Sequence, residues 1–245
     1  MAQMAHPLIL AFDTSGPWCA TALLQGGRVL AQRREELAKG QAERLMPLIT
    51  ATLADAGLPL DRLDAIAVGI GPGNFTGIRI SVAAARGLAL ALGVPAIGVS
   101  NFEAMRGPGS RRATGAELVS LPAPRGGLYL QRFEMGHESR PPDHLPNGQA
   151  PDWTALLGID RHVHILGARA DLLSALLAGP AGVESRPPAR PASLPETDLA
   201  ATLARIAADK LADKLADGAC WPRPAPLYVK PADAAPQRHA APTIL

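Results

Sequence analysis

The first hundred residues alternate between short apolar runs and longer stretches with helical spacing. The apolar runs end at polar or glycine positions, as strands do, and the glycine pair 26–27 marks a tight turn between two of them. This pattern predicts three strands, a helix, a strand, a helix and a strand, in that order. The predicted strands cover 7–15, 18–25, 28–36, 64–71 and 94–100, and the predicted helices cover 41–57 and 76–92.

The two predicted helices differ in how their apolar residues are distributed. In the first, Leu45, Leu48, Ile49 and Leu53 recur at the spacing of one helix face. The second reads IRISVAAARGLALAL from residue 78 and is apolar or small almost all round, so more than one side of it should be covered. One side can rest on its own sheet, and the small residues allow another helix to approach closely on the other side.

After residue 105 the pattern is weaker, and proline-rich connections separate the elements. Strands are predicted at 116–122, 127–135 and 162–167, and helices at 168–179 and 196–218. The order of elements in the first part is that of a ribonuclease-H-like lobe. We therefore expect an α/β protein in three parts: a first lobe over 1–105, a second, reduced lobe over 106–195, and a C-terminal helix and tail over 196–245 that pack back on the lobes.

Composition narrows the class of protein. Of the 245 residues, 47% are hydrophobic, which is enough for a sizeable core, and the formal net charge is only +2. Because no block of consecutive lysines and arginines occurs, a dedicated nucleic-acid-binding protein is not expected. The two cysteines are too few for a disulfide framework, and the N-terminus lacks the basic and apolar regions of a signal peptide. We expect a soluble cytoplasmic protein with no membrane segment.

The glycine-rich stretch GPGNFTG at 71–77 looks like a phosphate-binding loop but fails both common patterns. A P-loop requires GxxxxGK[ST], whereas here Gly77 is followed by Ile78. The dinucleotide pattern GxGxxG fails as well, because Thr76 stands where its third glycine should be. We expect the glycines to shape a sharp turn from strand to helix, with Asn74 or Thr76 capping the helix.

Four segments together resemble the TsaB family, also called YeaZ. They are ILAFDTSGPWCATALL at 9–24, AERLMPLI at 42–49, the long stretch at 68–105 that contains GPGNFTGIR, and PLYVK at 226–230. The resemblance implies a two-lobed fold of the actin, Hsp70 and sugar-kinase superfamily, with the second lobe reduced. One departure is PAPRGGLY at 122–129, where similar proteins usually carry Asp-Ala-Arg.

The resemblance also implies a noncatalytic role. Members of this family are partners of TsaD, the enzyme that transfers threonylcarbamoyl to adenosine 37 of tRNA. The two metal-binding histidines of TsaD align with Asn101 and Met105, so we expect no metal, no cofactor and no catalytic residue in this chain. Implied partners are a TsaD-like subunit, a TsaE-like ATPase and a second copy of the chain, with tRNA reached only through the complex. Alternatives are an ATP-dependent kinase-like enzyme, a glycoprotease-type metallopeptidase and a self-contained homodimeric binding protein.

Two groups of residues are candidate sites. Asp13 ends the first strand, where actin-like ATPases and sugar kinases place a carboxylate for phosphate or magnesium. A ligand loop would consist of Asp13, Thr14, Gly71, Gly73 and Thr76. In the TsaB family, paired helices from two first lobes pack into a four-helix bundle. The expected partner interface would then include Leu45, Leu48, Ile49, Leu53, Arg79, Val82, Ala83 and Arg86, with one of Val82 and Ala83 pointing out of the lobe.

Overall fold

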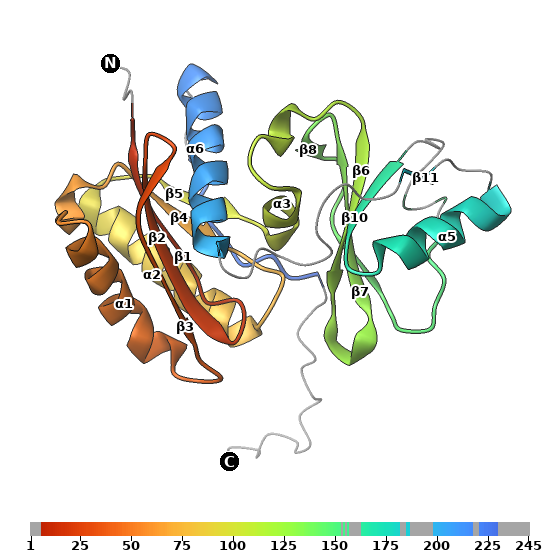
Figure 1. Ribbon diagram of the computed structural model, residues 1–245, viewed down its shortest axis with the longest axis horizontal. Helices are drawn as coiled ribbons and strands as arrows, with labels where there is room; N and C mark the ends of the chain where they lie inside the picture. The colour runs from red at the N-terminus through yellow and green to blue at the C-terminus, as the bar shows by residue number, and fades with distance from the viewer. Residues whose placement is uncertain are drawn as a thin grey trace, which may run out of the picture.

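The computed structural model contains two α/β lobes, each built on its own sheet, which lie beside each other in Figure 1. It describes residues 6–152, 154, 156, 163–181, 185–186, 198–217 and 221–229. The helix α6 lies between the first sheet and the short helix α3 (Figure 1).

The first sheet has the strand order β3-β2-β1-β4-β5. Its strands are β1 (Leu8–Asp13), β2 (Trp18–Gln25), β3 (Arg28–Glu36), β4 (Ala65–Gly69) and β5 (Ala96–Val99). The first three form an antiparallel meander, and β4 and β5 continue the sheet in parallel with β1. This order confirms the predicted ribonuclease-H-like lobe.

Helices cover both faces of the first sheet, which explains why β1 and β4 are buried along their whole length. α1 (Gln41–Asp55) and α2 (Phe75–Leu92) cover one face, and α6 (Leu199–Asp217) covers the other (Figure 1). Alternate residues of β1 therefore enter different cores. Leu10 packs with the α1 and α2 side, whereas Ile9 packs with the α6 side.

The second sheet repeats the strand pattern of the first. Its order is β11-β10-β6-β7-β8, and β9 also pairs with β7. The central strand β6 is antiparallel to β7 and parallel to β10. In the same way, β1 of the first sheet is antiparallel to β2 and parallel to β4. The strands are β6 (Ala116–Pro122), β7 (Leu128–Glu134), β8 (His137–Glu138), β9 (Asp143–Leu145), β10 (Val163–Gly167) and β11 (Ser185–Arg186). α5 (Ala170–Ala181) packs on β10.

The remaining described helices are short. They are α3 (Asn101–Arg106) and the 3-10 turns η1 (Leu60–Arg62), η2 (Ser110–Arg112) and η3 (Pro124–Gly126). The sequence pattern did not predict α3. Its residues Phe102 and Met105 pack on the second sheet, so the expected boundary at 105/106 falls inside a helix that contacts both lobes. The expected boundary at 195/196 lies outside the described residues.

Candidate functional site

Asp13, the first candidate residue, ends β1 and is completely buried. Its Oδ1 accepts three hydrogen bonds: from the Ser15 backbone N–H at 3.0 Å, from the Ser15 hydroxyl at 2.9 Å and from the Trp18 indole N–H at 2.8 Å. Its Oδ2 has no hydrogen-bond partner among the described residues. Burial raises the pKa of Asp13 above its usual value, against the opposing effect of the hydrogen bonds from Trp18 and Ser15.

The raised pKa of Asp13 predicts a pH-dependent effect of Asp13→Asn on stability. Because the carboxyl holds its proton more tightly in the folded chain, its stabilising contribution is complete below about pH 3.8 and is lost as the pH rises through the folded-state pKa. The asparagine side chain cannot ionise. We therefore expect the melting temperature of the variant minus that of the unmodified chain to increase from pH 4 to pH 8. Each kcal/mol that ionisation of Asp13 costs the folded chain should add about 2–4 °C to this difference. Thermal unfolding across that range measures it, and a constant difference would contradict the assignment.

Trp18 folds back over the turn that follows Asp13. Its ring lies so close over Gly16 that a Cβ atom at that position would collide with it. The Arg34 guanidinium also lies over this ring, 4.3 Å from its centroid. Asp13 is therefore closed off by the side chain that donates a hydrogen bond to it.

The glycine-rich loop before α2 is held against the hairpin between β1 and β2. A Cβ atom at Gly73 would collide with the Ser15 carbonyl, and one at Gly77 with the Thr14 carbonyl. The Asn74 N–H donates to the Ser15 carbonyl at 2.6 Å, and the Thr14 hydroxyl donates to the Gly77 carbonyl at 2.6 Å. Gly73 and Gly77 thus permit close packing of two loops, a role that the sequence did not predict, whereas Gly71, with φ 90°, lies in the turn between strand and helix where a glycine was expected.

Asn74 rather than Thr76 caps α2, since its side chain accepts a hydrogen bond from the Gly77 N–H at 2.8 Å. Of the five residues of the proposed ligand loop, Asp13, Thr14 and Gly71 are buried, whereas Gly73 and Thr76 are exposed. The buried side chains bond to the loop itself, so the five residues do not line a common open site.

Five of the residues predicted to meet a partner lie in the core of the first lobe beneath α1 and α2: Leu45, Leu48, Ile49, Leu53 and Val82. The prediction that they face a partner is wrong. The apolar stripe of an amphipathic helix packs on the sheet of its own lobe, and Val82 is accordingly only 3% exposed. Of the pair considered in the sequence, Ala83 is the one that points out of the lobe.

An exposed stripe on α2 remains for a partner. Ala83, Arg86, Gly87 and Leu90 recur at helical spacing and are all exposed, and the side chain of Leu90 reaches 82% exposure. The neighbouring α1 adds Met46 at 43%. We call Ala83, Arg86, Gly87, Leu90 and Met46 the outer face. The helices that carry it, α1 and α2, lie on the side of the first sheet opposite α6 (Figure 1).

The composition of α2 would also suit a membrane helix, and it is the one helix of the described chain that is long and apolar enough to cross a membrane. Its position on β4 and beside α1 marks it as a layer of the first lobe. Ser81, buried within it, donates its hydroxyl to the carbonyl of Gly69 in β4 at 3.3 Å, a contact between this helix and the sheet.

Arg79 lies at the N-terminal end of the same stripe and contacts the C-terminal segment. Its guanidinium lies 3.7 Å from the centre of the Phe75 ring, and its Nε donates to the Tyr228 hydroxyl at 2.7 Å. The Leu227 N–H donates to the Ile70 carbonyl at 2.8 Å, which fixes this segment beside the glycine-rich loop. One of the four segments that resemble the TsaB family, 226–230, thus packs on the first lobe through its described residues.

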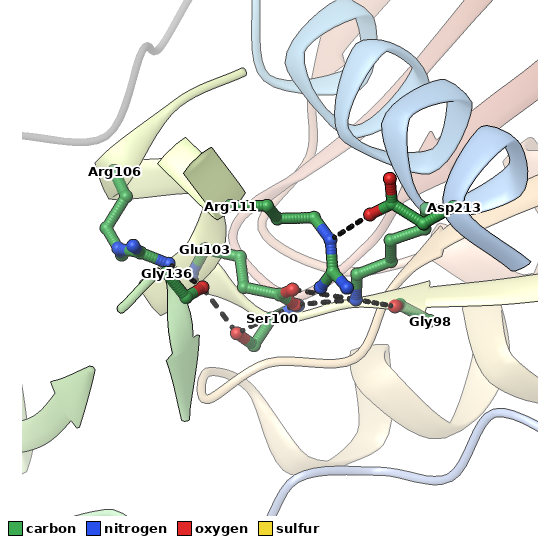
Figure 2. Close-up of polar contacts among 8 residues, drawn as sticks. Gly98, Ser100, Glu103, Arg106, Arg111, Gly136 and Asp213 are labelled. Atoms are coloured by element: carbon green, nitrogen blue, oxygen red, sulfur yellow. Dashed lines mark hydrogen bonds and ion pairs between the residues drawn. The ribbon is translucent and has the colours of Figure 1, made fainter. Parts of the chain in front are cut away.

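Sequence reasoning missed a buried ionic cluster where α3 meets α6. Figure 2 shows Glu103, Ser100 and Gly98 gathered at this junction. The Lys210 ammonium donates to the Glu103 carboxylate at 2.9 Å and to the Gly98 carbonyl at 2.8 Å. Ser100 and Glu103 form a capping box, whose S-x-x-E pattern is visible in the sequence, but the partner Lys210 is 107 residues away in the chain.

Further ion pairs connect the same region to α6 and to the second lobe. Arg111 donates to Asp213 of α6 at 2.9 Å (Figure 2). Arg106, whose side chain is buried, donates to the Glu117 carboxylate at 2.7 Å and to the Gly136 carbonyl at 3.2 Å. These contacts hold α3 between the lobes.

Comparison with known proteins gives the family. The sequence model of TsaD, described as tRNA N6-adenosine threonylcarbamoyltransferase, matches residues 34–241. The tRNA threonylcarbamoyladenosine biosynthesis protein TsaB of Bacillus subtilis is 36% identical over 163 residues, which are 65% of this chain and 70% of that protein. The chain belongs to the TsaB family. The resemblance drawn from the four sequence segments is therefore confirmed.

Other relatives agree with this assignment. TsaB of Haemophilus influenzae is 42% identical over 107 residues, 42% of this chain and 43% of that protein. An uncharacterized protein of Mycobacterium tuberculosis is 37% identical over 135 residues, which are 54% of this chain and 62% of that protein's length. A Pseudomonas aeruginosa crystal structure, described as similar to peptidase YEAZ, aligns with 91% of this chain and 100% of its own at a TM-score of 0.61 and 28% identity. The two-lobed α/β fold expected for the family is confirmed.

Proposed function

We propose that the chain is the noncatalytic subunit of a tRNA-modifying complex, in which it binds a TsaD-like subunit and activates threonylcarbamoyl transfer to adenosine 37 of tRNA. The exposed outer face of α2 is the observation that carries this proposal. Family membership supplies the reaction, and the outer face supplies the surface on which a partner would pack.

The outer face has the chemistry of a helix-docking surface. The small residues Ala83 and Gly87 let a partner helix approach closely, and the exposed side chain of Leu90 offers apolar area for it to bury. The flanking Arg86 is exposed and can pair with a carboxylate at the rim of the interface. A homodimer through the same face would be the resting form of the chain without its partner.

Two features support a noncatalytic role. Asp13 is closed off by Trp18, so it has no access to a phosphate or a metal ion. Asn101 and Met105, which align with the metal-binding histidines of TsaD, are both buried in α3. Asn101 uses its amide to donate to the Pro72 carbonyl at 2.7 Å and to the Ser15 hydroxyl at 3.2 Å, a role in packing loops together.

The assembly that we propose also contains a TsaE-like ATPase and acts in the cytoplasm, with tRNA bound once the complex has formed. Within the chain, residues 1–105 would form the partner-binding lobe and 106–195 the reduced second lobe. Residues 196–245 would join the two, since α6 contacts the first sheet and α3.

Reconstitution tests the proposed function. A TsaD-like protein, a TsaE-like ATPase, unmodified tRNA and the threonylcarbamoyl donor are combined with and without this chain, and threonylcarbamoyladenosine is quantified. We expect the chain to co-elute with the TsaD-like protein and to be required for formation of threonylcarbamoyladenosine. Equal product formation without the chain, together with no co-elution, would refute the proposal.

A separate prediction concerns ATP binding. Because the loop at Asp13 is closed, it cannot form an ATP site of the kind found in actin or in sugar kinases. We expect ATP with magnesium neither to be hydrolysed by the purified chain nor to raise its melting temperature. A ligand present at 100 times its dissociation constant stabilises a protein by about 2.7 kcal/mol, so thermal unfolding with millimolar ATP would detect a tight site. A saturable shift of that size would favour the kinase-like alternative.

A further inference from the structure

A cleft of about 690 Å³ lies where the first lobe, the second lobe and the C-terminal segment meet, and the proposed function does not use it. One wall comes from the glycine-rich loop and the start of α2, and the opposite wall comes from η3, β7 and the stretch after β9. The C-terminal segment completes it. Its lining includes Phe75, Arg125, Tyr129, His144, Asn147 and Tyr228.

Aromatic rings stand on both sides of this cleft. Phe75 and Tyr228, from α2 and the C-terminal segment, have ring centres 5.1 Å apart and are each about two-fifths exposed, at 39% and 42%. From the second lobe, Tyr129 and His144 form another ring pair with centres 5.5 Å apart. The first pair is exposed and the second is half-buried, so rings from both lobes are available for stacking against a planar ligand.

The charges around the cleft are positive. None of its lining residues is an aspartate or a glutamate, whereas Arg125 lines it and Arg79 lies against its Phe75 and Tyr228 rings. Arg125 is exposed and makes no ion pair with the described residues. Asp143, which precedes His144 in β9, is paired with Arg140 at 3.5 Å. The cleft therefore favours a ligand that is both planar and anionic.

We propose that this cleft binds an unpaired nucleotide of an RNA strand, with its base among the aromatic rings and its phosphate near Arg125. A free nucleoside triphosphate shares this chemistry but carries several charges and a magnesium ion, and the lining offers no carboxylate for the metal. A phosphodiester carries one charge per nucleotide, which the arginines can match. Stacking with little hydrogen-bond readout makes such a contact tolerant of sequence.

The identity of the RNA as tRNA rests on the proposed function, whereas the cleft itself does not. With a net charge of only +2, the chain alone would hold RNA weakly and over a short range. In the complex, this contact would add to those of the catalytic subunit. Its contribution would be to hold an unpaired stretch of the tRNA while the catalytic subunit acts on adenosine 37.

RNA binding by the chain alone tests the cleft. Fluorescence anisotropy with a labelled, single-stranded RNA of mixed sequence at low salt compares the unmodified chain with Tyr228→Ala and Arg125→Glu. We expect each variant to weaken binding about tenfold, and Arg125→Glu to lower the slope of log affinity against log salt by about 0.7, the value for one phosphate contact on a single strand. Tyr228→Phe, which keeps the ring, should retain most of the affinity.

Arg62→Glu is the matched control, since Arg62 is exposed in η1 and outside the cleft lining. Competition with AMP and ATP distinguishes binding of a free nucleotide from binding of a nucleotide within an RNA strand. The proposal is overturned if no RNA binding is detected at low salt, if Arg62→Glu weakens it as much as Arg125→Glu does, or if AMP binds as tightly as the RNA. Co-elution of Tyr228→Ala and Arg125→Glu with the TsaD-like protein tests the proposed function separately.

Discussion

Replacing Ala83 with glutamate is expected to leave the chain folded but unable to bind a TsaD-like protein or a second copy of itself. Ala83 is exposed in the middle of the outer face of α2, so the substitution costs the isolated chain little. In a helix-to-helix interface, the carboxylate would be buried without a partner. Such a charge costs about 4 kcal/mol, roughly a thousandfold in the dissociation constant, and stimulation of threonylcarbamoyl transfer should be lost with it.

Light scattering and the reconstituted transfer assay measure this effect on variants shown to be folded by circular dichroism. Ala150→Glu is the matched control, because Ala150 is exposed in the second lobe and away from the outer face. Val82→Glu, one residue from the test position, should instead unfold the first lobe, since Val82 is buried against the sheet. If Ala83→Glu associates and activates normally while Asp13→Asn abolishes activity, the chain works through the loop at Asp13 and the outer-face proposal fails.

Removing the positive charge of Lys210 is expected to lower the stability of the folded chain strongly. The Glu103 carboxylate is buried at the junction of α3 and α6, and Lys210→Met would leave it with hydrogen bonds from Ser100 but no paired cation. Breaking a buried ion pair by removing one partner costs about 3 kcal/mol, and for a chain of this size this corresponds to a fall of roughly 10 °C in the melting temperature. Differential scanning calorimetry measures the fall.

Two further variants separate the ion pair from other effects of the substitution. Lys39→Met makes the same change at an exposed lysine outside the cluster and should shift the melting temperature by less than about 2 °C. The double variant Glu103→Gln with Lys210→Met should recover much of the loss, because the buried charge is then absent. A melting temperature of Lys210→Met equal to that of Lys39→Met would show that the pair does not hold α6 in place.

The elements of the first lobe could be predicted because their signals are local. The turn at Gly26 and Gly27 and the strands on either side of it follow from adjacent residues, and the structure has those strands at the predicted positions. The start of α2 is set by Asn74, and its end by Gly93, which adopts φ 69° in the left-handed region. The helix α3 was missed because its six residues are too few for a periodic pattern to be recognised.

The candidate site was only partly predictable. Periodicity correctly grouped Leu45, Leu48 and Ile49 on one face of α1, but it cannot say whether a face meets its own sheet or a partner. Similarly, the carboxylate at the end of β1 could be found from its position in the chain. Its closure by Trp18, five residues away, depends on how the hairpin folds back over Gly16.

The sequence by itself determined the order of elements in the first lobe, the glycine-rich turn and the family, because each is carried by neighbouring residues or by a contiguous motif. Only the tertiary structure decided which face of α2 stays exposed, that Lys210 pairs with Glu103, and that Phe75, Tyr129 and Tyr228 line one cleft. The physical reason is the same in each case. Burial and pairing depend on distances in space between segments up to a hundred residues or more apart, and local pattern carries no information about those distances.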